Sequence, residues 1–189
     1  MSVTPDLILV PLATGFEETE AVAIIDVLRR AELPVVVAGL EPGPCLGAHG
    51  ITLATDMALD EVDPQRVRMI VLPGGMPGTV HLMEDERVLS IVRALHGDGR
   101  AVAAICAAPM VLAAAGVLAG REATSHPSVR QKLGDARVVD APRVVRDGTV
   151  VTSQGPGTAL EFALALVEDL VDPETARELG QAMLVAGSR

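Results

Sequence analysis

The sequence predicts an α/β fold in which a mostly parallel sheet carries helices on both faces. Continuous apolar runs, typical of strands buried on both faces, alternate with segments of helical periodicity along the chain. The loops between them are short, and no repeat or low-complexity linker divides the sequence. With 189 residues, the chain has the length of one domain, so residues 1–189 are expected to share one fold.

The first part of the chain repeats a strand followed by a helix. Leu7–Leu12 is a continuous apolar run, and residues 17–31 carry apolar side chains at helical spacing. Thr14 and Glu17 have the spacing of a capping box at the start of that helix. Further strands are expected at 34–38, 51–54, 69–72 and Ala101–Ile105, and further helices at 84–96 and between Cys106 and residue 116.

The last third of the chain contains shorter strands and two more helices. Strands are expected at 123–125, 137–140, 143–146 and 149–152, and helices at 158–170 and 173–185. Asp147 and Gly148 supply the turn of a small β-hairpin. Thr158 and Glu161 form a second candidate capping box.

Composition excludes several classes of function. Phe16 and Phe162 are the only aromatic residues and the net charge is −10, so a nucleic-acid partner is not expected. Two cysteines are too few for a disulfide framework. The N-terminal residues lack the basic segment of a signal peptide. Together these two observations favour a cytoplasmic protein. Residues 101–120 carry no charge, but small residues and Pro109 favour a buried strand and helix over a membrane span.

Cys106 is the strongest candidate for chemistry. Sharp turns at 13–15, 73–75 and 106–108 follow strands, and the carboxyl ends of parallel strands meet at one edge of a sheet. Cys106 lies between a buried strand and a helix, where a nucleophile is exposed and the helix N-terminus favours a thiolate. The alternative is a structural cysteine that packs as a small apolar residue.

Residues at the neighbouring turns could complete an active site. The backbone amides of Gly75 and Ala107 could form an oxyanion hole, although Gly74-Gly75 could equally be a simple tight turn. Among the carboxylates at 17, 18 and 20, Glu20 leans toward the apolar stripe of its helix and could move a proton, but helix geometry does not exclude Glu17.

Histidine and cofactor motifs give weaker signals. His126 follows a short strand after the Cys106 helix and could reach the same edge, although a lone histidine is more often structural. No histidines or cysteines have metal-ligand spacing, and neither a phosphate-binding loop nor a dinucleotide fingerprint occurs, so no metal or cofactor is expected.

Five motifs together resemble one family. GFEETE (15–20), VLPGG (71–75), AAICAAP (103–109), TSHP (124–127) and TSQGPGT (152–158) occur in the order found in the DJ-1 branch of the DJ-1/PfpI superfamily. The resemblance implies a flavodoxin-like three-layer sandwich and a homodimer.

The resemblance also assigns residues. It places the family's reactive cysteine on Cys106, its pocket carboxylate on Glu20, its oxyanion-hole glycines on Gly74 and Gly75, and its pocket histidine on His126. The chain departs from the family at three positions: protease-like branches carry His where Ala107 stands, and the DJ-1 branch has Arg near the position of His49 and a second reactive Cys at that of Ala54.

Three functions are therefore considered. In the first, the Cys106 thiolate adds to a small 2-oxoaldehyde such as methylglyoxal, Glu20 and His126 move the proton, and a 2-hydroxy acid is released without a cofactor. The resemblance also implies deglycase activity on glycated amines and a stress-protective role. The alternatives are a redox-sensing stress protein or chaperone that uses oxidation of Cys106, and an amidase or peptidase-like hydrolase that needs a Cys–His pair.

Overall fold

The computed structural model describes residues 6–185 and has a seven-stranded sheet at its centre. In spatial order the strands are β10 (Val144–Asp147), β11 (Val150–Ser153), β7 (Ala101–Ile105), β6 (Val67–Leu72), β1 (Leu7–Leu12), β2 (Val35–Gly39) and β5 (Met57–Ala58). All neighbours run parallel except β10 and β11, which form the predicted hairpin around Asp147 and Gly148.

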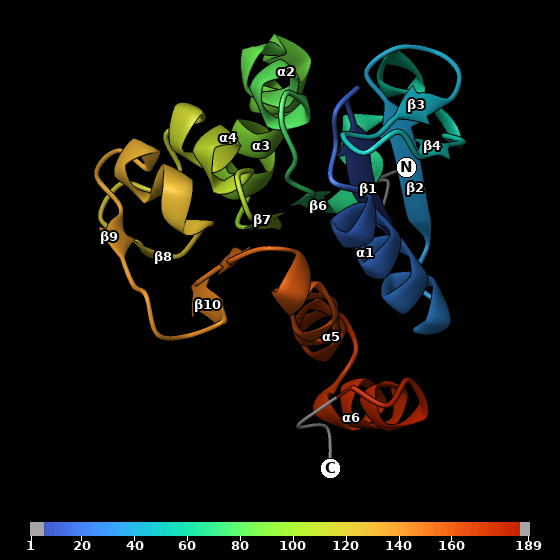
Figure 1. Ribbon diagram of the computed structural model, residues 1–189, viewed down its shortest axis with the longest axis vertical. Helices are drawn as coiled ribbons and strands as arrows, with labels where there is room; N and C mark the ends of the chain where they lie inside the picture. The colour runs from blue at the N-terminus through green and yellow to red at the C-terminus, as the bar shows by residue number, and fades with distance from the viewer. Residues whose placement is uncertain (1–5, 186–189) are drawn as a thin grey trace.

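Helices cover both faces of the sheet, so the flavodoxin-like sandwich is confirmed (Figure 1). On one face lie α1 (Glu18–Arg30) and α5 (Ala159–Leu170), with α6 (Pro173–Ala182) packed against α5. On the other face lie α2 (Gly78–Glu84), α3 (Glu86–Gly97) and α4 (Pro109–Ala114).

Two apolar layers fill the space between sheet and helices. Along β1, Ile8 and Val10 belong to the layer under α1 and α5, whereas Leu9 belongs to the layer under α2, α3 and α4. Successive side chains of a strand point to opposite faces, so a strand buried on both faces must be apolar throughout. Phe16 and Phe162 are both fully buried, and both lie in the layer under α1 and α5.

The charge-free run at 101–120 folds as the sequence predicts, into β7, the turn at Cys106 and α4. Within residues 6–185, no helix has both the length and the apolar character needed to cross a membrane.

The short elements were harder to predict. The strand expected at 51–54 is β4 (Thr52–Leu53), which pairs with β3 (Cys45–Leu46) in a separate antiparallel ribbon. The strands expected at 123–125 and 137–140 are β8 (Glu122–Ala123) and β9 (Arg137–Val138), which pair outside the main sheet.

Neither predicted capping box forms. At α1 the N-cap is Glu17 itself, whose Oε2 accepts the Glu20 amide at 2.6 Å; Thr14 lies farther upstream because Gly15, at φ +90°, turns the chain before the helix begins. At α5 the Thr158 hydroxyl bonds within its own loop, and Glu161 pairs with Arg143 at 2.6 Å instead of reaching back.

Candidate active site

The three turns that follow β1, β6 and β7 meet at the carboxyl edge of the sheet, as predicted. The Glu17 amide donates to the Gly74 carbonyl at 2.8 Å, and the Gly78 amide donates to the Gly15 carbonyl at 3.2 Å. A Cβ added to Gly74 would lie 2.7 Å from the Cβ of Cys106. The absence of a side chain at Gly74 therefore allows the β6 turn to approach the cysteine.

Cys106 has a strained backbone. Its φ is +64°, in the left-handed region that non-glycine residues rarely adopt. The conformation is held from both sides, because the Cys106 amide donates to the Ser153 carbonyl at 3.1 Å and its carbonyl accepts the His126 amide at 2.7 Å. Such strain costs on the order of 1–3 kcal/mol and is concentrated at functional sites.

Glu20 is fully buried at the start of α1. Its Oε2 accepts the Gly74 amide at 2.7 Å, whereas no protein group in the described part of the chain hydrogen-bonds its Oε1. Burial raises the pKa of Glu20 to about 7, although hydrogen bonds from the Gly74 amide and the Cys106 thiol oppose the shift. The carboxyl can therefore gain or lose a proton near neutral pH.

The thiol of Cys106 does not have the low pKa that its position between a strand and a helix suggested. Burial and the adjacent Glu20 charge raise the pKa of Cys106 to about 12, and the amides of Ala107 and Gly75 only partly oppose this. Burial therefore outweighs the effect expected from the helix N-terminus, and the charge beside the thiol is a carboxylate. The two groups compete for protons, so each titration depends on the other.

Of the other residues predicted for this site, Gly74, Gly75 and Ala107 lie beside Cys106 or Glu20, whereas the His126 side chain is exposed. The backbone amides of Gly75 and Ala107 lower the pKa of the Cys106 thiol, whereas the Gly74 amide donates to Glu20. His126 is exposed, and its ring Nδ1 lies 2.7 Å from the Ser128 hydroxyl. Its bond to Cys106 comes from its backbone amide.

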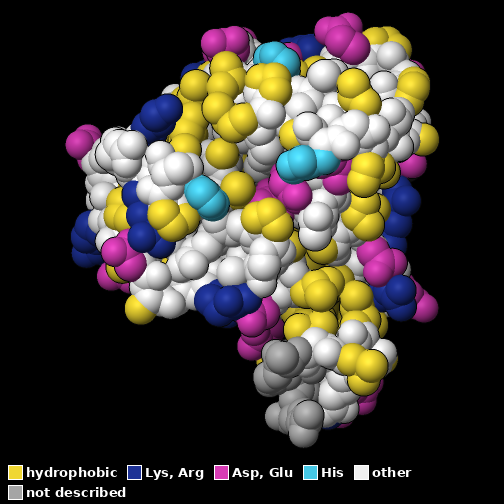
Figure 2. All heavy atoms as spheres, in the orientation of Figure 1, with side chains coloured by type: hydrophobic (Ala, Val, Ile, Leu, Met, Phe, Trp, Pro, Cys, Tyr) yellow, Lys and Arg dark blue, Asp and Glu magenta, His cyan; other side chains and the backbone are white. Residues whose placement is uncertain are grey.

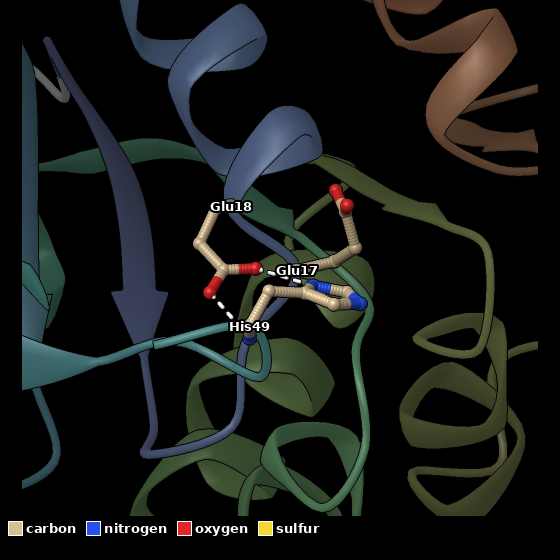
Figure 3. A group of neighbouring side chains, drawn as sticks. All are labelled: Glu17, Glu18 and His49. Atoms are coloured by element: carbon tan, nitrogen blue, oxygen red, sulfur yellow. Dashed lines mark hydrogen bonds and ion pairs between the residues drawn. The ribbon is translucent and has the colours of Figure 1, made fainter. Parts of the chain in front are cut away.

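Glu18 and His49 form a pair beside the site that the sequence did not indicate (Figure 3). Glu18 accepts the His49 amide at 2.6 Å and lies 2.8 Å from His49 Nδ1. Burial raises the pKa of Glu18, but hydrogen bonds from His49 and Ile51 outweigh it and lower the pKa to about 2. The loop after β3 is thus fastened to α1 by an ionised carboxylate.

This pair and Glu17 could together offer ligands to a metal ion. One oxygen or nitrogen atom each of Glu17, Glu18 and His49 lies within 4.8 Å of the others. Glu18 is already bonded to the loop, and Glu17 accepts the Glu20 amide at 2.6 Å. A cation would have to replace these bonds. Figure 2 shows histidine side chains close to acidic ones on this face of the molecule.

The chain matches known proteins over nearly its whole length. Residues 6–169 match the model of the DJ-1/PfpI family. Protein dj-1beta of Drosophila melanogaster is 42% identical over 180 residues, which cover 94% of this chain and 96% of that protein. The crystal structure of Drosophila melanogaster DJ-1beta has a TM-score of 0.93 and 40% identity, covering 97% of this chain and 100% of that one.

Two further relatives bear on function. Glutathione-independent glyoxalase DJR-1.2 of Caenorhabditis elegans is 38% identical over 182 residues, which cover 95% of this chain and 96% of that protein. A structure of Toxoplasma gondii DJ-1 in an oxidized form has a TM-score of 0.91 and 35% identity, covering 95% of this chain and 98% of that one.

Proposed function

Because the chain belongs to the DJ-1/PfpI family, we propose that it is a cofactor-independent glyoxalase that converts small 2-oxoaldehydes such as methylglyoxal into 2-hydroxy acids. The observation that carries the proposal is the pairing of a strained Cys106 with the fully buried, readily protonated Glu20. One group supplies a nucleophile and the other a proton carrier.

The first step is addition of Cys106 to the aldehyde. Glu20 takes the thiol proton, and the sulfur attacks the aldehyde carbon to form a hemithioacetal. Transfer of the proton removes the charge of Glu20, which otherwise raises the pKa of the thiol. The amides of Gly75 and Ala107, which lower the pKa of the thiol, would hold the oxygen of the former aldehyde as negative charge develops on it.

The second step moves a proton between the two carbons. Glu20 first passes the thiol proton to the oxygen of the former aldehyde and is ionised again. It then removes the proton from the former aldehyde carbon and returns it to the neighbouring carbonyl carbon. The hydroxyl proton moves to the oxygen of that neighbouring carbon, which leaves a 2-hydroxy thioester on Cys106. One water molecule hydrolyses this thioester, releasing lactate from methylglyoxal and restoring the thiol. Because the His126 Nδ1 lies 2.7 Å from the Ser128 hydroxyl, any assistance from His126 would come from its Nε2.

A deglycase activity, a cytoplasmic location, a homodimer and a stress-protective role are further parts of this proposal. Adducts of 2-oxoaldehydes with amines present a similar carbon to Cys106, so deglycase activity would use the same residues. We also propose a cytoplasmic homodimer with a stress-protective role. Val22 on α1, Leu46 on β3 and Ile51 just before β4 are 46%, 47% and 57% exposed, which supports self-association.

The two cysteines provide a matched test of the proposed activity. Cys106→Ala is expected to lower kcat/KM for lactate formation from methylglyoxal by on the order of 10³-fold or more, because it removes the nucleophile. Cys45→Ala is expected to keep nearly full activity, since Cys45 is buried on β3 outside the site. The assay is run without glutathione, and unchanged turnover in Cys106→Ala would contradict the proposal.

A redox-sensing function is the second candidate. Cys106 is partly accessible, and the amides of Gly75 and Ala107, which lower the pKa of its thiol, would also stabilise an oxidised cysteine anion. A relative has been solved in an oxidized form. Mild peroxide is expected to add two oxygen atoms at Cys106 but none at buried Cys45, as measured by peptide mass spectrometry. Equal oxidation of both cysteines would argue against a specialised site.

An amidase or peptidase mechanism has less support. It needs an imidazole beside the nucleophile, whereas the His126 ring contacts Ser128 and Ala107 follows Cys106.

A further inference from the structure

A cavity of about 430 Å³ lies at the edge of the sheet opposite Cys106. The starts of β6, β7 and β11, the turn between β10 and β11 and the end of α5 surround it. The five residues of β7 separate it from Cys106 by roughly 16 Å at about 3.3 Å per residue. It is therefore distinct from the candidate active site.

Three arginines and one carboxylate line this cavity: Arg68, Arg100, Arg146 and Asp169. Arg100 is fixed, because its side chain is only 19% exposed and donates to the Val67 carbonyl at 2.6 Å. Arg100 also pairs with Asp98, and Arg146 pairs with Glu168 and Asp169, so the charges of these two are matched.

Arg68 is different. Its Nη2 donates to the Leu170 carbonyl at 3.0 Å, but it forms no ion pair with any carboxylate among residues 6–185. Every other arginine within residues 6–185 forms at least one such pair. Arg68 is thus an exception in a chain of net charge −10, because its guanidinium has no carboxylate partner in the described part of the chain. It also shares its cavity with two further arginines.

The remaining surface indicates the size and character of a ligand. Met69, Ala101 and Val151 contribute apolar surface beside the arginines, and the volume is within the range of small-molecule sites and larger than an inorganic anion requires. Guanidinium groups bind phosphate oxygens through paired hydrogen bonds. Within the part of the chain that the structure describes, Arg68 uses one of its five N–H groups, in its bond to Leu170.

We propose that this cavity binds a small organic phosphate, with the phosphate group held by Arg68 and supported by Arg100 and Arg146. A phosphate dianion fits better than a single carboxylate, because three arginines and only one carboxylate line the same space. The apolar surface would contact the organic part of the ligand.

Calorimetric titration at constant ionic strength tests the proposal with ribose 5-phosphate, inorganic phosphate, ribose and acetate as probes. The wild type is expected to bind ribose 5-phosphate more tightly than inorganic phosphate, and to bind ribose and acetate not measurably. Arg68→Gln is expected to weaken ribose 5-phosphate at least about tenfold, the effect of losing charge-assisted hydrogen bonds. Arg93→Gln is the control, because Arg93 lies on α3 and pairs with Glu86.

Equal affinity of the wild type and Arg68→Gln, or absence of ribose 5-phosphate binding to the wild type, would overturn the proposal. Acetate binding as tightly as ribose 5-phosphate would also overturn it, by showing a carboxylate site. Cys106→Ala is expected to bind ribose 5-phosphate like the wild type, whereas loss of binding there would locate the ligand at the other edge of the sheet. The outcome is therefore independent of the glyoxalase assay.

Discussion

Glu20→Gln is expected to lower kcat/KM for methylglyoxal by about 10²–10⁴-fold while making the protein more stable above pH 7. The loss follows because an amide cannot take the Cys106 proton or carry it between carbons. The gain follows because the folded protein must keep Glu20 buried as an anion at high pH.

The sign of the pH dependence follows from the pKa of Glu20, which burial raises to about 7. The folded state then binds this proton more tightly than the unfolded state. Stability from Glu20 is complete below about pH 4.5 and is lost as the pH rises through 7, by about 3 kcal/mol for this shift. Glu20→Gln removes that loss.

Urea unfolding at pH 5 and pH 8 measures this difference. Glu84→Gln is the matched control, since Glu84 is an exposed carboxylate at the end of α2. Glu20→Gln should gain stability relative to the wild type between these pH values, whereas Glu84→Gln should follow the wild type. A Glu20→Gln variant with wild-type turnover, or with the wild-type pH dependence, would show that Glu20 has no such role.

Gly75→Ala is expected to destabilise the fold by at least about 3 kcal/mol. Gly75 has a φ of +97°, and a Cβ there would lie 2.2 Å from the Glu17 nitrogen and 2.5 Å from the Phe16 carbonyl carbon. Both contacts are with backbone, which cannot move aside without displacing the start of α1. The cost of overpacking therefore adds to the cost of a left-handed alanine.

Gly116→Ala separates the two contributions. Gly116 also has a positive φ, +81°, but no atom lies within 4 Å of the position of its Cβ. Urea unfolding should show a loss of only about 1–2 kcal/mol there. Similar losses in both variants would mean that the close approach of the β6 turn to α1 contributes little to stability.

Sequence patterns predicted the large elements because those elements are buried in a regular way. β1 and β7 have the predicted bounds, since both are continuous apolar runs. By contrast, β3 and β5 have two residues each and α2 begins with Gly78, so none of them has enough periodicity to be recognised.

The candidate site was only partly predictable for the same physical reasons. The strand-to-helix position indicated Cys106, but periodicity alone could not choose between Glu17 and Glu20. That choice depends on which carboxylate meets Gly74, a residue more than 50 positions away along the chain. The bond between Glu18 and His49 spans 31 residues and has no local signal either. The direction of the Cys106 pKa shift depends on burial and on Glu20, which a turn motif does not report.

The placement of Phe16 and Phe162 in a single layer has a spectroscopic consequence. The chain contains no tyrosine or tryptophan, so the side chains of Phe16 and Phe162 are its only phenyl rings. Their ring currents act only over short distances, on methyl groups of the layer under α1 and α5. In a methyl NMR spectrum, strongly shifted valine, leucine and isoleucine resonances should therefore belong to that layer. The same signals would show whether α1, which carries Glu20, moves when a ligand reaches Cys106.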